Sequence, residues 1–302
     1  MVADAPIVPA LVGPTAAGKS QIALDVAEQV DAEIVAVDAF TVYRGMDIGT
    51  AKPTAEEQRR VQHHLVDVLD PTQPCTVEWF QKAARAAIDD VLLRGHTPLL
   101  VSGSGLYFRA VVDPLEFPPT DPALRAEIAR RYGEDAGRAH ADLRAADPEA
   151  AARIDPANLR RSVRALEVLA LTGRPFSDWR RAWERWEPVY PGLRIVGVAV
   201  SRDDLARRID ERVDAMLDAG WLEEATRLHA AALSSTARQA IGYAELFAHL
   251  DGRLELSEAV GRIKTRTRQF AARQDRWFRR DPRVQWVSAD DAPDQLRMRC
   301  TL

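Results

Sequence analysis

The sequence has little that would hold together an extracellular or a membrane protein. It contains only two cysteines, Cys75 and Cys300, which are far apart and fit no metal-binding or disulfide spacing. No apolar run approaches the roughly 18 residues that cross a membrane. The N-terminus has neither the basic start nor the cleavage site of a secretory signal. We therefore expect a cytoplasmic protein in a reducing compartment, with no membrane partner.

A strong net charge is also missing. The 302 residues carry a formal charge of −4, so the chain as a whole is not a basic nucleic-acid binder. The charge is nevertheless uneven, because residues 262–283 contain nine Lys or Arg against two Asp. We expect a local positive surface there. With 46% hydrophobic and 28% charged residues, the chain is long enough for one large domain or two small ones.

A phosphate-binding motif lies near the start of the chain. Residues 13–20 match G-x-x-x-x-G-K-[ST] without a mismatch, after an apolar run at 7–12 that predicts a strand and before a helical pattern at 20–28. The backbone N–H groups of such a loop converge on an anion, Lys19 adds a charge, and the Ser20 hydroxyl can hold Mg²⁺. The motif predicts a phosphate chain as ligand and does not specify ATP. The residues expected at the phosphates are Gly13, Pro14, Thr15, Ala16, Ala17, Gly18, Lys19 and Ser20.

Strands and helices alternate over the first 115 residues. Apolar runs at 32–38 and 97–102 predict strands, and residues 76–94 predict a helix that Thr76 caps and Gly95 ends. This alternation predicts an α/β fold, a parallel sheet of the P-loop NTPase type flanked by helices. Ligands of such sheets lie beyond the carboxyl ends of the strands. The loop, Asp38 and residues 102–105 should therefore share one crevice.

Four prolines within residues 113–122 indicate a boundary between domains. The next 70 or so residues are Ala- and Arg-rich and predict helices, whereas residues 194–201 again predict a strand. We expect a P-loop catalytic core made of residues 1–115 and 194–302, with C-terminal helices. An all-helical subdomain, residues 116–193, should be inserted into it. The C-terminal helices are expected at 203–219, 221–232, 243–250 and 256–278.

Asp38 directly follows a predicted strand, and its local pattern allows three roles. It can hold Mg²⁺ through water as ATPase carboxylates do, act as a general base towards a second substrate, or cap a helix. The polar segment 43–53 that follows has more specific groups than an ordinary loop needs. His63 and His64 have no third ligand nearby in sequence, so we expect no metal site there.

Taken together, these segments resemble the tRNA dimethylallyltransferase family in its short, bacterial form. The resemblance covers nearly the whole chain in the family's order, and the blocks at 43–53, 242–243 and 277–278 are its most specific parts. Three positions depart from the common pattern, namely Ala39, Ser102 and Arg276. The matching segments are residues 13–20, 38, 42–53, 63–71, 103–108, 164–168, 172–175, 239–243, 273–274 and 277–279.

The resemblance implies transfer of a dimethylallyl group from dimethylallyl diphosphate to N6 of adenine 37, next to the tRNA anticodon, with release of diphosphate. Asp38 would be the general base, Ser104 would hydrogen-bond N6, and Lys19 and Arg212 would bind the diphosphate with Mg²⁺ on Ser20. The partner would be the tRNA anticodon stem-loop, which the inserted subdomain 116–193 would help to bind, and we expect a monomer. The implied tRNA contacts are Asp38, Ala39, Phe40, Thr41, Ser104, Arg125, Arg160, Arg161, Arg164, Gln239, Gly242, Tyr243, Arg273, Gln274, Trp277 and Arg279.

Three other functions use parts of the same pattern. An ATP-dependent small-molecule kinase shares the P-loop, and an adenylate isopentenyltransferase would use free AMP or ATP as acceptor. The long insert and the basic segment 262–283 argue against both. A non-enzymatic nucleic-acid-binding module would not need Lys19, Ser20 and Asp38 in one crevice.

Overall fold

The computed structural model describes residues 5–301, except for the side chains of residues 180–182. Its strands form an all-parallel sheet in the order β3-β2-β4-β1-β5-β6. The strands expected at 7–12, 32–38, 97–102 and 194–201 are all present, which confirms the predicted α/β class. The bounds are β1 Ile7–Val12, β2 Ala32–Val37, β3 His63–His64, β4 Thr97–Ser102, β5 Gly192–Ala199 and β6 Val284–Ser288.

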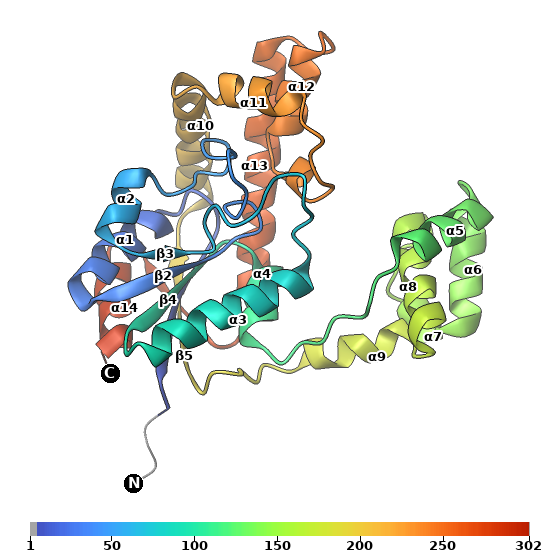
Figure 1. Cartoon of the computed structure of the whole chain (residues 1–302), viewed down its shortest axis with the longest axis horizontal. Helices are drawn as coiled ribbons and strands as arrows, with labels where there is room; N and C mark the ends of the chain where they lie inside the picture. The colour runs from blue at the N-terminus through green and yellow to red at the C-terminus, as the bar shows by residue number, and fades with distance from the viewer. Residues whose placement is uncertain (1–4, 302) are drawn as a thin grey trace. The chain divides into compact units, whose positions relative to one another are not determined.

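Helices cover both faces of this sheet (Figure 1). Successive side chains of a strand point to opposite faces, so Val8, Ala10 and Val12 of β1 enter one core and Leu11 enters the other. The Leu11 core is closed by α1 (Lys19–Val30) and α14 (Ala292–Thr301), and the opposite core by α3 (Val77–Leu93) and α4 (Gly105–Val112).

Local signals explain where several helices begin and end. The Thr76 side chain accepts a hydrogen bond from the Trp79 N–H and caps α3, and Gly95 follows the helix with φ +81°. The short helix α2 (Ala55–Arg60) has a capping box between Thr54 and Glu57. Five elements of the sheet and its flanking layers were not expected from the sequence, namely α2, the two-residue β3, α4, β6 and α14.

A second group of helices lies at the carboxyl end of the sheet (Figure 1). Leu205 and Ile209 pack against Ala271, and Ala16 of the phosphate loop packs against this cluster. These helices therefore reach the motif found near the start of the chain. They are α10 (Arg202–Asp218), α11 (Trp221–His229), α12 (Tyr243–Leu250) and α13 (Leu256–Phe278), with a 3₁₀ turn at Ala237–Gln239.

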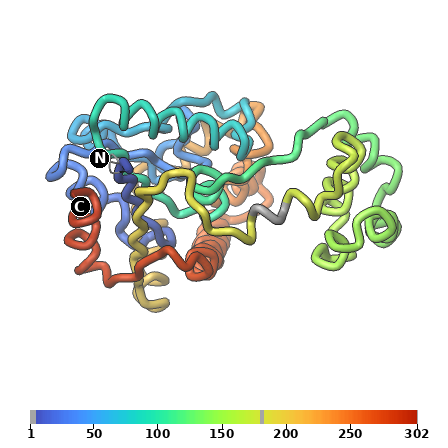
Figure 2. The backbone as a smooth tube through the Cα atoms, turned by 90° about the horizontal axis from the view of Figure 1, so that it is seen from below, coloured from blue at the N-terminus to red at the C-terminus, as the bar shows by residue number. Residues whose placement is uncertain are grey.

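The chain divides into two compact units, Pro114–Glu187 and the rest. Two segments join them, one after Asp113 and one before Pro188 (Figure 2). The insert was expected at 116–193, but β5 already begins at Gly192. None of the described helices is long and apolar enough to span a membrane. The helical unit contains α5 (Pro122–Tyr132), α6 (Ala136–Ala146), α7 (Pro148–Ala151), α8 (Leu159–Thr172), α9 (Phe176–Arg180) and a 3₁₀ turn at Arg181–Glu184.

Candidate active site

The register of the sheet brings three predicted site segments to one edge. Ser102 of β4 is level with Val12 of β1 and with Val37 of β2. The residues that follow these strand ends are Gly13, Asp38 and Gly103. They therefore start from the same edge, as expected for ligand-binding segments of a parallel sheet.

The phosphate loop has the backbone that the motif predicted. Gly18 has φ +88°, a left-handed conformation that glycine adopts without strain, and α1 begins at the next residue. The first N–H groups of α1 thus face the loop without partners inside the helix. The Lys19 ammonium donates a hydrogen bond of 2.7 Å to the Pro14 carbonyl, which holds it across the loop.

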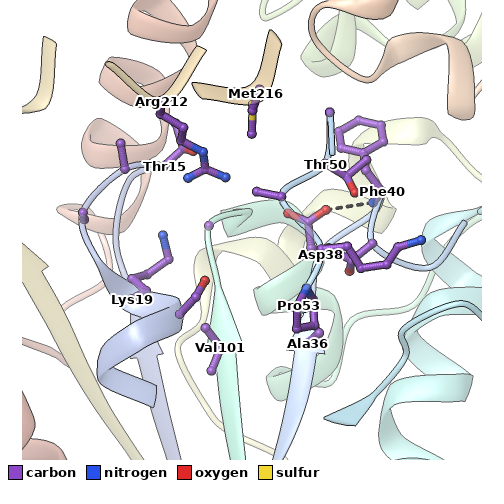
Figure 3. A pocket seen from close by; sticks show the side chains of 18 of the residues that line it. Thr15, Lys19, Ala36, Asp38, Phe40, Thr50, Pro53, Val101, Arg212 and Met216 are labelled. Atoms are coloured by element: carbon purple, nitrogen blue, oxygen red, sulfur yellow. Dashed lines mark hydrogen bonds between the residues drawn. The ribbon is translucent and has the colours of Figure 1, made fainter. Parts of the chain in front are cut away.

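A pocket of about 570 Å³ opens beside this loop. Figure 3 shows Lys19 and Arg212 on the loop side and Asp38 with Phe40 on the other side. The Asp38 carboxylate accepts a hydrogen bond of 2.8 Å from the Phe40 N–H. One pocket therefore combines two cations beside the phosphate loop with a carboxylate that faces them.

Burial changes the proton affinity of all three charged groups. Burial and the neighbouring Arg212 lower the pKa of Lys19 to about 7, although Asp38 opposes this shift. Burial raises the pKa of Asp38 above its usual range, against the N–H groups of residues 40 and 41 and the two cations. Burial also lowers the pKa of Arg212. In the described part of the chain none of the three forms an ion pair, so their charges are available to a ligand.

The donor groups suit a magnesium ion that a substrate phosphate also binds. Ser20 is exposed in the first turn of α1 and lines the pocket. The described residues contain no group of three or more His, Cys, Asp or Glu side chains that could hold a metal alone. Mg²⁺ commonly keeps waters and substrate phosphate oxygens and takes few protein ligands, so one hydroxyl beside the loop fits it. His64 instead bonds Glu33 at 2.6 Å, and His63 bonds the Val61 carbonyl at 2.8 Å.

Two departures from the common family pattern have structural explanations. The buried Ser102 hydroxyl donates to the Val37 carbonyl at 2.9 Å and accepts from the Ser104 N–H at 3.1 Å, so it ties the ends of β2 and β4 together. Ala39 is buried in the sheet core, so its side chain does not face the pocket. Ser104 is the N-cap residue of α4, and its side chain forms no capping bond. Gly103 lines the pocket, and Ser104 is absent from the described lining.

The predicted tRNA contacts in the helical unit fall into two kinds. Arg125 and Arg164 both pair with the fully buried Glu167, at 2.7 and 2.8 Å. Arg164 also donates to the carbonyls of Pro118 and Pro119. These two arginines therefore hold α5, α8 and the proline segment together. Arg160 and Arg161 are exposed near the start of α8.

The block at 239–243 is also divided. Gln239 is exposed and donates to the Ser235 carbonyl at 2.8 Å. The Tyr243 side chain is fully buried, and its hydroxyl donates to Glu224 at 2.7 Å. This leaves no surface of the Tyr243 side chain for tRNA, so the structure gives it a role inside the protein. Thr41 is buried as well, and its hydroxyl has no hydrogen-bond partner.

The structure corrects the expected positive surface at 262–283. Six of its nine cations form ion pairs, and most of the acidic partners lie outside the segment. Among the described residues of the segment only Arg273, Arg276 and Arg280 have none, and all three are exposed. The i, i+3, i+4 spacing of Arg273, Arg276 and the exposed Trp277 puts them on one side of α13, and Arg280 follows the end of that helix. Arg279 pairs with Asp275 and lies over the Trp286 ring at 4.6 Å. The paired residues are Arg262, Lys264, Arg266, Arg268, Arg279 and Arg283.

Two pocket residues have roles that were not expected from the sequence. Gln274, expected at tRNA, is buried and accepts a hydrogen bond of 2.8 Å from the Thr15 N–H of the phosphate loop. A Cβ at Gly103 would lie 2.8 Å from the amide nitrogen of Gln274, so Gly103 makes room for Gln274.

Arg208 also lines the pocket, one helical turn before Arg212. The i, i+4 spacing of these arginines was the only signal for Arg208 in the sequence.

Fold and site together define a class, an α/β protein whose phosphate loop and cations face a carboxylate in one pocket. Comparison with known proteins narrows this class. The sequence model of the IPP transferase family matches residues 41–281, and that of isopentenyl transferase matches residues 6–68. A tRNA dimethylallyltransferase from a Nocardioides species is 50% identical over 289 residues, which cover 95% of this chain and 92% of that protein.

Solved structures agree with the sequence comparison. The tRNA isopentenylpyrophosphate transferase of Bacillus halodurans is 37% identical with a TM-score of 0.69, over 97% of this chain and 94% of that one. A eukaryotic dimethylallyltransferase acting on tRNA is 25% identical with a TM-score of 0.81, over 94% of this chain and 74% of that one. The chain belongs to the tRNA dimethylallyltransferase family.

Proposed function

We propose that this protein transfers a dimethylallyl group from dimethylallyl diphosphate to N6 of adenine 37, beside the anticodon of tRNA, and releases diphosphate. Membership of the family supports the reaction. The observation that carries it to these residues is the pocket itself, which has a volume of about 570 Å³. Lys19 and Arg212 lie on one side of this pocket and Asp38 on the other.

The acceptor half of the reaction needs a base. The exocyclic amine of adenine is a poor nucleophile because its lone pair is delocalised into the ring. A carboxylate that takes the N6 proton as the N–C bond forms removes this obstacle. Asp38 is the pocket carboxylate that faces the two cations, whereas the carboxylate of Glu57, which also lines the pocket, is bound to Thr54. Burial raises the pKa of Asp38, so it holds a proton more readily than an exposed Asp. Ser104 lies outside the described pocket lining, so we assign it no contact.

The donor half needs stabilisation of the leaving diphosphate, whose bridging oxygen gains negative charge as the bond to carbon breaks. The loop N–H groups, Lys19 and Arg212 are positioned to offset that charge. Mg²⁺ on Ser20 would add a further positive charge at the same phosphates. The bond broken is carbon to oxygen, the bond formed is carbon to N6, and the proton of N6 goes to Asp38.

An adenine stacked in a tRNA loop must leave its stack to reach this pocket. We propose that the exposed arginines bind the anticodon stem-loop, namely Arg160 and Arg161 of the helical unit and Arg273 and Arg276 of α13. Their charges suit phosphates, which set the affinity of nucleic-acid binding. Trp277, which follows Arg276 in α13, is 38% exposed and offers a surface for stacking.

The function is tested by incubating the protein with labelled dimethylallyl diphosphate and Mg²⁺, together with unmodified tRNA or with AMP. We expect label on tRNA only, at the adenine next to the anticodon. Label on AMP would instead identify an adenylate isopentenyltransferase. No labelled product with either acceptor, together with ATP-dependent phosphorylation of a small molecule, would contradict the proposal.

A further inference from the structure

The side chain of Glu224 is buried to 1% exposure in α11, and its carboxylate binds a distant loop. One oxygen accepts the N–H groups of Asp47 and Ile48, both at 2.8 Å. The other oxygen accepts the Gly49 N–H at 3.0 Å and the Tyr243 hydroxyl at 2.7 Å. Four donors from two other segments therefore converge on one carboxylate. No other carboxylate of the described chain accepts hydrogen bonds from three consecutive backbone N–H groups. Glu224 therefore holds the backbone of this loop in a way that no other acidic residue of the described chain does.

The packing around Glu224 fixes the same segments. The Trp221 indole, one turn earlier in α11, lies between Gly49 and Gly242. A Cβ at either glycine would come within 2.2 Å of the indole ring, and Gly242 has φ +102°. These two positions must therefore be glycine for Trp221 to fit. This contact joins two separate blocks of specific sequence, 43–53 and 242–243, through one side chain.

The loop that Glu224 binds continues directly into the pocket wall. Residues 49–53 line the pocket, as do Trp221 and Ile241 from the other two segments. Figure 3 shows Thr50 and Pro53 on the same side as Asp38 and Phe40, across from Lys19 and Arg212. Glu224 itself is not among the lining residues. It thus acts on the carboxylate side of the pocket without touching a ligand.

We propose that Glu224 is a positioning residue, whose carboxylate fixes the Asp47–Gly49 loop so that the wall beside Asp38 holds the acceptor adenine in line with the prenyl carbon. The inference rests on the proposed function for the identity of the acceptor. It predicts that loss of Glu224 slows transfer and leaves the diphosphate side intact, because the phosphate loop, Lys19 and Arg212 do not touch this carboxylate.

The test is Glu224→Gln, with Glu223→Gln as a matched control. An amide keeps the size of the side chain but has only one accepting oxygen, so it cannot accept from all four donors. Glu223 is the neighbouring residue on the same helix, and its substitution removes the same charge. Tyr243→Phe is a milder variant, because it removes one neutral donor and leaves the three backbone N–H groups bound to Glu224.

Calorimetry with inorganic diphosphate and Mg²⁺ gives the fraction of sites that are folded, and the transfer rate is divided by that fraction. For Glu224→Gln we expect diphosphate affinity within about twofold of wild type and a kcat per site roughly 10- to 100-fold lower, the range for a misplaced reactant. Tyr243→Phe should lower kcat a few-fold, and Glu223→Gln should not change it. Hydrogen exchange at the Asp47–Gly49 amides should be faster in Glu224→Gln.

Two results would overturn the inference. One is a kcat per diphosphate-binding site equal to wild type in Glu224→Gln, which would mean that the carboxylate serves stability alone. The other is unchanged amide exchange at Asp47–Gly49. A wild-type protein that binds diphosphate and transfers nothing to tRNA would contradict the proposed function instead, and the exchange measurement would still decide whether Glu224 holds the loop.

Discussion

The pocket and helix α13 both concentrate charge, and they use it in opposite ways. In the pocket, Lys19, Arg212 and Asp38 form no ion pair within the described chain and lie where burial perturbs their pKa values. Along α13 and just beyond, most cations pair with acids of neighbouring elements, such as Lys264 with Asp214 at 2.7 Å. In this protein, buried charged side chains that have no ion-pair partner indicate the functional site. The cations that are clustered in the sequence at 262–283 mostly form ion pairs that hold elements of the fold together.

The strongest test of this contrast is Asp38→Asn, which keeps the shape of the side chain and removes the base. We expect transfer to slow roughly 10²- to 10⁴-fold, the usual effect of a lost general base, while tRNA binding stays nearly unchanged. Single-turnover rates and a filter-binding assay measure the two quantities. Asp31→Asn is the control, since Asp31 is the exposed C-cap of α1 and Asn adopts its left-handed backbone readily. Turnover near the wild-type rate would mean that Asp38 is not the base.

A smaller effect is expected on the loop side. Lys19→Met removes the charge and the hydrogen bonds that Lys19 can give to a phosphate, and charge-assisted bonds of this kind correspond to roughly a 10- to 100-fold loss of affinity. Calorimetry with dimethylallyl diphosphate should show this loss, and transfer should slow as well. Unchanged affinity would show that the Lys19 ammonium stays bound to the Pro14 carbonyl.

The perturbed pKa of Lys19 gives a pH test. Because that pKa is about 7 in the free protein, the site must take up a proton to bind diphosphate above pH 7. The contribution of Lys19 to affinity should therefore be complete below pH 7 and fall by up to about tenfold per pH unit above it. Affinity measured from pH 6 to 9 checks this, and the Lys19→Met variant reports the titration of the ligand itself. Parallel curves for the two proteins would contradict the assignment.

The smallest effect concerns α13. Arg273→Gln with Arg276→Gln removes two unpaired cations, and every phosphate that they no longer neutralise should flatten the slope of log affinity against log salt by about 0.7. The matched variant replaces the paired Arg262 and Arg268 by Gln and should change the slope less. The measurement is tRNA affinity at several salt concentrations. Equal changes of the salt slope in both variants would show that Arg262 and Arg268 bind tRNA phosphates in spite of their ion pairs.

The sequence predicted those parts of the site that depend on local order. Lys19 and Ser20 follow from a motif with fixed spacing, and Asp38 from its place after a buried strand, so their convergence required only the rule for parallel sheets. The role of Glu224, and the bond of Gln274 to the phosphate loop in place of its expected tRNA contact, could not be predicted in this way. Glu224 meets its loop across 175 to 177 residues, and Gln274 meets Thr15 across 259. Contacts of this length leave no periodicity in the chain.

The helices and strands that the sequence predicted were likewise those that depend on local sequence signals. Helices α12 and α13 have the limits that their patterns predicted, because a long amphipathic repeat and nearby glycines define them. The strand β6 was missed because it has only five residues and two of them are polar, so its pairing with β5 decides its structure. The positive surface was overestimated for a related reason, since counting residues 262–283 ignored acids such as Asp214 and Glu245 that the fold brings against them.

The most direct test of the proposed function is to measure which ligand the phosphate loop prefers, because a prenyltransferase binds dimethylallyl diphosphate there and a kinase binds ATP. Calorimetry on the wild-type protein with Mg²⁺ should compare dimethylallyl diphosphate with ATP. We expect that the prenyl diphosphate binds more tightly, that Lys19→Met weakens this binding, and that ATP is not hydrolysed at its γ-phosphate. Tight binding and hydrolysis of ATP without binding of the prenyl diphosphate would contradict the proposed function.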